Sequence, residues 1–333
     1  MGFLNNNKRI FDQDYNKIKK ICIKNNSLFI DTTFPPTDES LFLESGKNSE
    51  IVWKRPSELV DNPKLFVEGA SFGDVQQGIL GNCWCLSAFL GLTLNKSLMN
   101  KVLPDCTKQE WNSNNHYVGI FKFSFWRYGK WENIIIDDLL PTKNNELLFA
   151  RSKTPNEFWP ALLEKAFAKM YGCYENLSGG QLSDALLDVS GGVPENIVFA
   201  KFLESEECDR NQKISKLFKL LEREFACQSL MVAAIGAKGG ENEEVLSNGL
   251  ILRHAYAITA VRYIELDAKN ASFKYFSKLE KKMMIRLRNP WAEGEYNGAW
   301  SDASEEWNQV SVLQKKELGI VLGNCVTPHG FFV

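Results

Sequence analysis

The stretch that most constrains the fold is QQGILGNCWCLSAFL at residues 76–90, where a polar turn with two glycines runs into an apolar segment. The segment from Cys83 to Leu94 is rich in Ala and Leu and long for a strand, which favours a buried helix. Asn82, directly before it, is a residue type that caps helix N-termini. The sequence therefore predicts a core helix that begins at Cys83.

Cys83 and Cys85 admit three interpretations: a nucleophile, a metal or disulfide pair, or core packing. The chain has eight scattered cysteines, and no second Cys or His pair stands at the spacing of zinc ligands, which argues against a zinc site. A Cys in the first turn of a helix gains from the partial positive charge there, which favours thiolate. Cys85 lies about 200° further round the helix. We therefore expect Cys85 to be a packing residue.

The composition is that of a globular protein large enough for two domains, with 333 residues, 44% hydrophobic and 24% charged. A net charge of -2 gives no sign of an electrostatic field that would attract nucleic acid or a membrane surface. The longest apolar stretches are too short to span a bilayer, and the N-terminus has no signal peptide. We therefore expect a cytoplasmic protein with reduced thiols, no integral membrane segment and no nucleic-acid partner.

The chain changes character at Gly191–Gly192, which we interpret as a joint between domains. Residues 1–26 read as an N-terminal extension or anchoring helix. Before the joint, residues 27–191 carry loops at 29–66, helix patterns at 83–94 and 155–171, and a strand–turn–strand pattern at 117–137. After it, residues 192–333 carry a helix at 211–225, strands at 229–235, 255–263, 273–276 and 284–288, and an acidic loop at 238–248. A mainly helical lobe and a β-rich lobe predict an α+β fold with a cleft between them.

Three histidines, His116, His254 and His329, limit the candidates for Cys/His catalysis. His254 precedes an alternating strand, so its ring can project from a rigid edge, although a structural role is as compatible with the pattern. Asn289 ends a strand before a proline. A thiolate nucleophile needs an imidazolium partner, and that ring needs an acceptor for its other N–H. Gln77 could donate a side-chain N–H to a developing oxyanion, beside the backbone N–H of Cys83.

Three segments together resemble the catalytic segments of the calpain family: QGILGNCW at 77–84, GLILRHAY at 249–256 and IRLRNPW at 285–291. DTTFPP at 31–36, VWKRP at 52–56, FWPALLEKAFAK at 158–169 and GAWSD at 298–302 follow the order of that family. The resemblance covers roughly residues 10 to 333. It implies a papain-like, calcium-dependent cysteine endopeptidase that performs limited proteolysis of proteins through an acyl-enzyme thioester.

The resemblance assigns a role to each catalytic candidate. Cys83 would be the nucleophile, His254 the general base and acid, and Asn289 the group that orients the imidazole. Gln77 would complete the oxyanion hole. Trp291 resembles the Trp that covers the catalytic Asn. Asn82 stands where the family has Asp, and Ala292 where Gly is usual.

The resemblance also implies two Ca²⁺ sites, one in each half. In the first, Asp74 and Glu157 would give carboxylates and Val67 and Gly69 carbonyl oxygens, the hard ligands that Ca²⁺ prefers. In the second, two acidic residues match, Glu295 and Asp302. The family's Asp-Gly-Glu turn is replaced here by residues 329–331, and the Arg that would pair with its Glu is Phe72, so we expect the second site to be weakened.

The last strand of the second half and the C-terminal modules of the family are missing from the sequence as given. The expected partners are protein substrates, with a small regulatory subunit or an inhibitor protein as further candidates. The alternative is a calpain-like scaffold with little or no proteolytic activity, because the second calcium site and the C-terminal end are altered.

Overall fold

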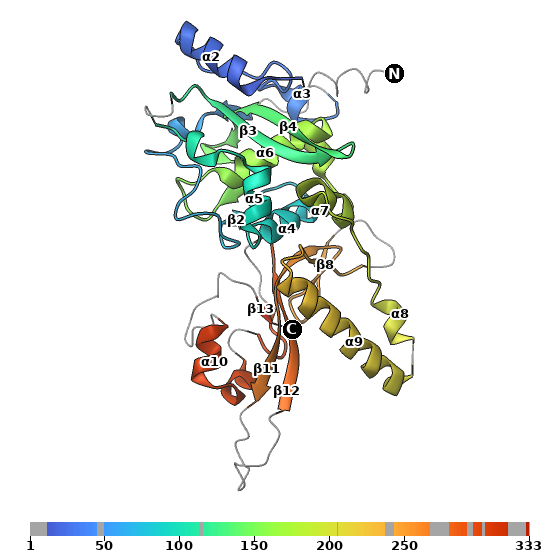
Figure 1. Ribbon diagram of the computed structural model, residues 1–333. Helices are drawn as coiled ribbons and strands as arrows, with labels where there is room; N and C mark the ends of the chain where they lie inside the picture. Colours follow the sequence, from blue (N-terminus) through green and yellow to red (C-terminus); the bar gives the residue numbers. More distant parts are fainter. Residues whose placement is uncertain are drawn as a thin grey trace. The chain divides into compact units, whose positions relative to one another are not determined.

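The computed structural model describes residues 12–44, 50–112, 116–204, 206–236, 243–266, 280–291, 296–301, 304–318 and 331–332. The chain divides into two compact units, Met1–Pro194 (unit 1) and Glu195–Val333 (unit 2) (Figure 1). The predicted joint at residues 191–192 lies just before this division. Helices and sheets occur together, so the predicted α+β class is confirmed.

Unit 1 is organised by two buried helices, α4 (Cys83–Leu92) and α6 (Trp159–Tyr171). Every residue of α4 is buried, because the segment is apolar on all sides and has no face to turn to water. Pro160 lies in the first turn of α6, where its missing N–H costs nothing, and Gly172 with φ 105° ends the helix. The other helical segments of the described part of the unit are α2 (Tyr15–Asn25), α3 (Asp38–Leu41), α5 (Lys96–Val102), α7 (Leu182–Ser190) and 3-10 turns at Pro56–Glu58, Cys106–Lys108 and Glu175–Leu177.

The predicted strand–turn–strand is confirmed as an antiparallel hairpin, β3 (Ile120–Arg127) and β4 (Lys130–Asp137), in which Arg127 pairs with Lys130. Tyr128 and Gly129 form the turn with φ of 52° and 77°. Positive φ at both positions gives a turn whose twist matches that of the strands. Two smaller sheets are β1 (Val52–Lys54), β5 (Leu140–Lys143) and β6 (Glu146–Leu147), and β2 (Val75–Gln76) with β7 (Arg151–Ser152).

Aromatic rings fill the space between α6, α4 and β3. Phe167 of α6 lies 5.8 Å from Trp84 and 5.3 Å from Phe89, both on α4, measured between ring centroids. The ring of Phe125 on β3 is 5.3 Å from Phe167 and nearly perpendicular to it. These tilted and edge-to-face contacts add to the burial of apolar area, so the position of α4 is fixed by its neighbours.

Two lysines of α6 are completely buried and are paired with aspartates from distant parts of unit 1. Lys165 Nζ lies 2.5 Å from Asp137 Oδ1 at the end of β4, and Lys169 Nζ lies 2.6 Å from Asp31 Oδ2. The backbone N–H of Asp31 donates to Asp137 Oδ2 at 2.7 Å. The segment around Asp31 was predicted as a surface loop, but its aspartate lies in the core because the lysine needs a counter-charge.

Unit 2 is a four-stranded sheet in the order β13–β12–β11–β8, built on the antiparallel pair β11 (Ala255–Leu266) and β12 (Glu280–Arg288). β8 (Val232–Ala234) and β13 (Phe331–Phe332) pair at the edges. The long helix α9 (Glu207–Ala226) packs on β11 through Phe218, which contacts Ile258 and Val261. The remaining described elements are α8 (Ala200–Leu203), β9 (Glu244–Val245), β10 (Ile251–Leu252), a 3-10 turn at Glu305–Gln309 and α10 (Val312–Glu317).

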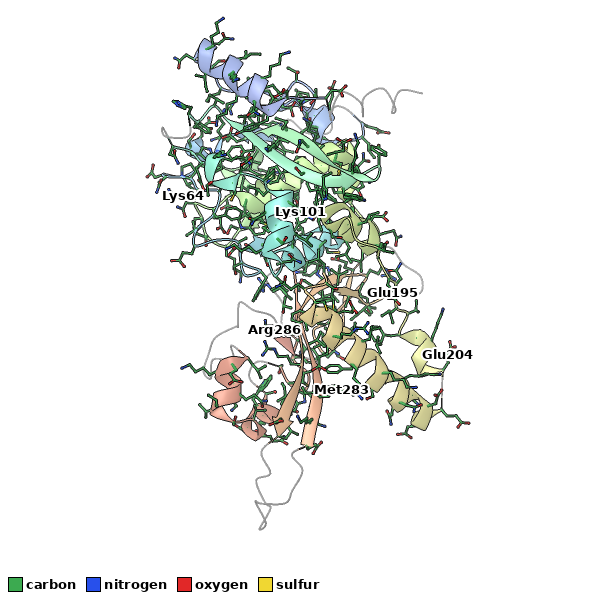
Figure 2. All side chains as sticks on the ribbon, in the orientation of Figure 1. Lys64, Lys101, Glu195, Glu204, Met283 and Arg286 are labelled. Carbon is green, nitrogen blue, oxygen red and sulfur yellow. The ribbon has the colours of Figure 1, made fainter. Side chains whose placement is uncertain are left out.

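A second apolar cluster of unit 2 includes Ile264, Met284 and Trp307. Beside it, Arg286 of β12, labelled in Figure 2, donates to Thr259 Oγ1 at 2.9 Å and to the carbonyl of Leu318 at 3.2 Å. The guanidinium therefore joins the sheet to the end of α10. Within the described part of the chain, no helix combines the length and the apolar character needed to cross a membrane.

Three predictions of local structure need correction or lie outside the described residues. The predicted loop at 29–66 contains α3 and β1, because Ser40 and Leu41 are buried. The predicted acidic loop at 238–248 contains β9, which pairs with β10. The predicted strand at 273–276 lies outside the described residues.

The buried ion pairs of α6 give the first testable prediction. Replacing Lys169 by Met leaves the Asp31 carboxylate buried without its counter-charge, so we expect the free energy of unfolding to fall by about 3–5 kcal/mol. Urea denaturation followed by circular dichroism measures the change. The control is Lys143→Met, which removes the lysine of an exposed pair with Glu50 and should leave the stability near that of the wild type. Equal stabilities of the two variants would contradict the prediction.

Candidate active site

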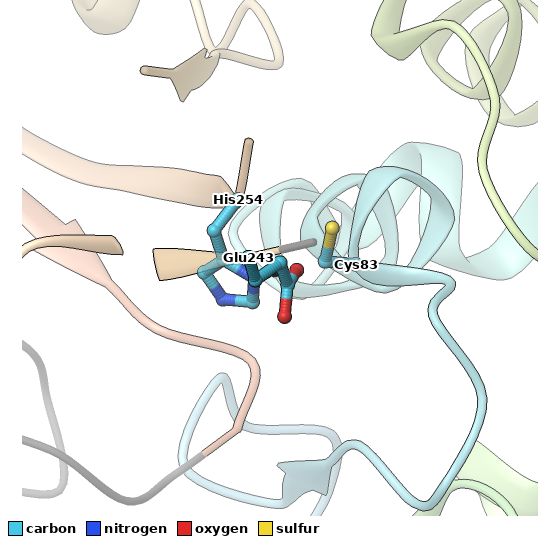
Figure 3. A group of neighbouring side chains, drawn as sticks. All are labelled: Cys83, Glu243 and His254. Carbon is cyan, nitrogen blue, oxygen red and sulfur yellow. Dashed lines mark hydrogen bonds and ion pairs between the residues drawn. The ribbon is translucent and has the colours of Figure 1, made fainter. Parts of the chain in front are cut away.

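Cys83 is the first residue of α4, as predicted, and only 8% of its surface is exposed. The carbonyl of Asn82 accepts the N–H groups of Cys85 and Leu86 at 3.1 and 3.2 Å, which starts the helix at Cys83. The thiol thus lies at the positive end of a buried helix (Figure 3).

The side chain of Asn82 does not cap this helix, in contrast to the prediction. Its Nδ2 donates instead to Glu164 Oε1 of α6 at 2.7 Å, and Glu164 Oε2 accepts the N–H of Ala150 at 2.9 Å. Glu164 is buried, and burial raises its pKa to about 7. The carboxyl group of α6 therefore holds the residue before Cys83, and the sequence pattern of α6 gave no sign of this link.

The turn before Cys83 is held close to the chain at residues 148–149. A Cβ on Gly78 would lie 2.4 Å from the carbonyl oxygen of Phe149, so only glycine fits there. The neighbouring Gln77 is buried, and its Nε2 donates to the carbonyl of Leu80 at 2.7 Å. This hydrogen bond holds in place the side-chain amide of Gln77, which was predicted to donate an N–H to an oxyanion.

Cys85 is fully buried, which confirms the prediction that it is a packing residue. Its Sγ donates to the carbonyl of Asn82 at 3.2 Å. Burial raises the pKa of this thiol well above its usual value, and the nearby carboxyl of Glu164 acts in the same direction. A neutral, enclosed thiol of this kind is a poor nucleophile.

In unit 2, the sheet brings His254 and Asn289 together. His254 immediately precedes β11 and Asn289 immediately follows β12, and the two strands pair with Ala257 opposite Arg288. His254 Nε2 lies 2.7 Å from Asn289 Oδ1, and both residues are buried. The backbone N–H of Trp291 donates to the same Oδ1 at 3.0 Å, so the amide oxygen is held facing the ring.

Two further groups contact the imidazole. The indole of Trp291, predicted to cover Asn289, lies 4.8 Å from the ring of His254, measured between ring centroids. Glu243 Oε1 lies 2.8 Å from the other ring nitrogen, Nδ1 (Figure 3). The sequence indicated an acidic segment around Glu243. It did not predict the short pairing of β9 with β10, which brings this carboxylate to the ring.

The residues of the first predicted calcium site lie near one another in unit 1. Glu157 Oε1 accepts the N–H of Val67 at 2.6 Å, and Asp74 Oδ2 accepts the N–H of Ser71 at 2.6 Å. Gly69, two residues after Val67, has φ 93°. Burial, together with the charge of Asp74, raises the pKa of Glu157 to about 7. Two carboxylates close enough to repel each other are hard oxygen ligands of the kind that Ca²⁺ prefers.

The residues of the second predicted calcium site, Glu295 and Asp302, lie outside the described residues, as does Ala292.

Comparison with known proteins gives a consistent match. Residues 29–325 match the model of the calpain family cysteine proteases. The chain is 55% identical over 326 residues to calpain-5 of Caenorhabditis elegans, covering 96% of this chain and 50% of that protein. It is 43% identical to calpain-5 of Mus musculus (93% and 48% covered) and 38% identical to the calpain-1 catalytic subunit of Sus scrofa (96% and 42% covered). The chain spans about half the length of the curated relatives it matches.

The Glu164–Asn82 contact gives a prediction with a pH dependence. The folded-state pKa of Glu164 lies above its ordinary value of 4.5, so the folded chain holds this proton more tightly than the unfolded chain. That stabilising contribution is complete below about pH 4.5 and is lost as the pH rises through about 7. Glu164→Gln keeps one donor and one acceptor without a titrating proton. Between pH 5 and pH 8 the variant should therefore gain about 2 kcal/mol relative to the wild type.

Urea denaturation of both chains at the two pH values measures this difference. Glu164→Ala, which loses both hydrogen bonds, should be less stable than Glu164→Gln at either pH. A stability difference between wild type and Glu164→Gln that does not change with pH would contradict the assignment.

Proposed function

Since the chain belongs to the calpain family of cysteine proteases, we propose that it is a calcium-dependent cysteine endopeptidase in which Cys83, His254 and Asn289 act as a triad. The proposal assigns nucleophilic attack on the peptide carbonyl to the Cys83 sulfur. A thioester forms, the amine leaves with a proton from His254, and water then hydrolyses the thioester with His254 as base. The substrates are proteins cut at a limited number of bonds.

The observation that carries the proposal is the buried hydrogen bond between His254 Nε2 and Asn289 Oδ1. Because the backbone N–H of Trp291 also donates to that oxygen, the oxygen is an acceptor toward the ring. An Nε2–H donated to Asn289 fixes the orientation of the ring and leaves Nδ1 to exchange a proton with the thiol. The reaction thus requires the Cys83 sulfur within hydrogen-bond reach of Nδ1.

The surroundings of Cys83 support its role as nucleophile. Its sulfur lies at the start of a buried helix, where the N-terminal partial charge is positive, whereas burial raises the pKa of Cys85 and keeps it a thiol. The backbone N–H of Cys83 and the remaining side-chain N–H of Gln77 are the donors that we assign to the oxyanion. Gln77 is suited to this because Leu80 already holds its amide nitrogen, so little reorganisation is needed.

We also propose that Ca²⁺ binds to the first site, through the carboxylates of Asp74 and Glu157 and the carbonyl oxygens of Val67 and Gly69. When bound, the ion would neutralise two carboxylates that otherwise repel each other. The loop of Val67 and Gly69 would then be tied to the segment before α6. The second site at Glu295 and Asp302, and a regulatory subunit or inhibitor protein, stay predictions from the sequence.

The triad is tested by cleavage of a disordered protein in the presence of calcium. Cys83→Ser should lower kcat/KM at least a thousandfold, and Asn289→Ala about tenfold or more, because the ring loses its orientation. Cys85→Ala is the matched control and should retain activity within about twofold. A limiting alkylating agent should label Cys83 and spare Cys85.

An active Cys83→Ser variant, or equal labelling of the two thiols, would contradict the triad. A wild-type chain without cleavage would favour the non-proteolytic scaffold.

The calcium site is tested by titration calorimetry of the full chain. Glu157→Gln and Asp74→Asn should each weaken Ca²⁺ binding at least about tenfold, because a hard cation loses a charged ligand. Glu110→Gln is the matched control: Glu110 is a half-buried carboxylate that accepts the N–H of Leu65, two residues before Val67, and it is not among the proposed ligands. Unchanged affinity in Glu157→Gln would exclude the proposed site, and two strong sites would overturn our prediction for the second half.

A further inference from the structure

Both ring nitrogens of His254 face oxygen acceptors. Nδ1 lies 2.8 Å from Glu243 Oε1, and Nε2 lies 2.7 Å from Asn289 Oδ1. A neutral imidazole carries one N–H and can donate to one of these oxygens, whereas an imidazolium donates to both. The arrangement therefore offers the ring two oxygen acceptors, a carboxylate at Nδ1 and an amide oxygen at Nε2.

The fold of the chain around Glu243 directs this contact. β9 and β10 form a small hairpin in which Glu244 pairs with Leu252, so Glu243 and His254 leave the same open end of the hairpin. At the other end, the N–H of Leu246 donates to the carbonyl of Leu250 at 2.7 Å. The hairpin thus carries the carboxylate to the ring.

Two contacts tie this hairpin to the sheet of unit 2, one to β11 and one to the residue directly after β8. The N–H of Ile251 in β10 donates to the hydroxyl of Tyr256 at 2.9 Å, and the ring of Tyr256 lies 5.1 Å from that of His254. Arg253, between β10 and His254, has φ 58° and donates its N–H to the carbonyl of Ile235 at 2.7 Å. The turn at Arg253 changes the direction of the chain, so the hairpin folds back toward the imidazole.

In the proposed mechanism, Nδ1 is the nitrogen that takes the thiol proton and later gives it to the leaving amine. Glu243 occupies that nitrogen, so the carboxylate and the sulfur compete for one N–H. We propose that Glu243 is an internal competitor of Cys83 for His254, which holds the ring in an inactive pairing until the carboxylate is displaced. This inference rests on the proposed function of His254.

The exposure of the two partners fits a contact that opens. The imidazole is fully buried, whereas 29% of the Glu243 side chain is exposed. A partly exposed carboxylate can return to water at a small cost in free energy, so the contact between Glu243 and His254 can break and form again. Tyr256, Trp291 and Asn289, which also contact the ring, are uncharged, whereas Glu243 brings a negative charge to it.

The contact itself is tested by NMR of the chain labelled with ¹⁵N-histidine, which has three imidazoles to follow. Glu243→Ala should lower the pKa of His254 by about one unit, because the imidazolium loses its counter-charge. Glu244→Ala removes a carboxylate one residue along the chain, in β9, and should leave the titration of His254 unchanged. An equal titration in wild type and Glu243→Ala would overturn the inference.

The competition is tested by cleavage of a disordered protein with the same variants. Glu243→Ala should raise kcat/KM about two- to fivefold, which is the scale of a partly exposed ion pair, and Glu243→Gln should raise it less because its amide oxygen still accepts from Nδ1. Glu244→Ala should match the wild type. Lower or unchanged kcat/KM in Glu243→Ala, with an active wild type, overturns this inference alone. No cleavage by any of the chains overturns the proposed function instead.

Discussion

The buried charges of α6 are the constraint on which unit 1 depends. The helix passes through the middle of the unit with Glu164, Lys165 and Lys169 all enclosed, and each charged or polar end must find a partner there. The partners come from three separate parts of the chain: the segment at Asp31, the end of β4 at Asp137, and the residue before the nucleophile. Apolar residues could fill the same volume, but they would not fix which segments meet.

The buried Glu164 of α6 also constrains the segment that carries the thiol of Cys83. Glu164 holds the side chain of Asn82, and the carbonyl of Asn82 begins the helix that carries Cys83. In unit 2, the register of the strands positions the side chains, since the pairing of β11 with β12 is enough to bring Asn289 to His254. A shift of the pairing by one residue would turn one of these side chains to the opposite face of the sheet. Each unit therefore positions its own share of the proposed catalytic residues by a different physical means.

The sequence predicted most of this where a local pattern carries the information. The apolar run after Asn82 gave the helix start at Cys83, and alternation gave the β3–β4 hairpin with its turn at Tyr128–Gly129. The class of fold and the family followed from short motifs in a fixed order. What local patterns could not give were contacts between distant polar groups. Asn82 was expected to cap its own helix, but a buried carboxyl from α6 competes successfully for its side chain.

Three glutamates show how burial separates roles that the sequence cannot separate. Glu164 is enclosed with two hydrogen-bond donors, so burial raises its pKa and the group serves structure. Glu157 is also buried but lies near a second carboxylate, Asp74, and a cation would relieve the repulsion between them. Glu243 remains partly exposed and contacts one imidazole, so its bond can be exchanged with water. The same side chain is thus a structural group at Glu164, a proposed metal ligand at Glu157 and a proposed competitor at Glu243. If the proposal holds, Glu243 is the group that would set when His254 becomes available to the thiol of Cys83.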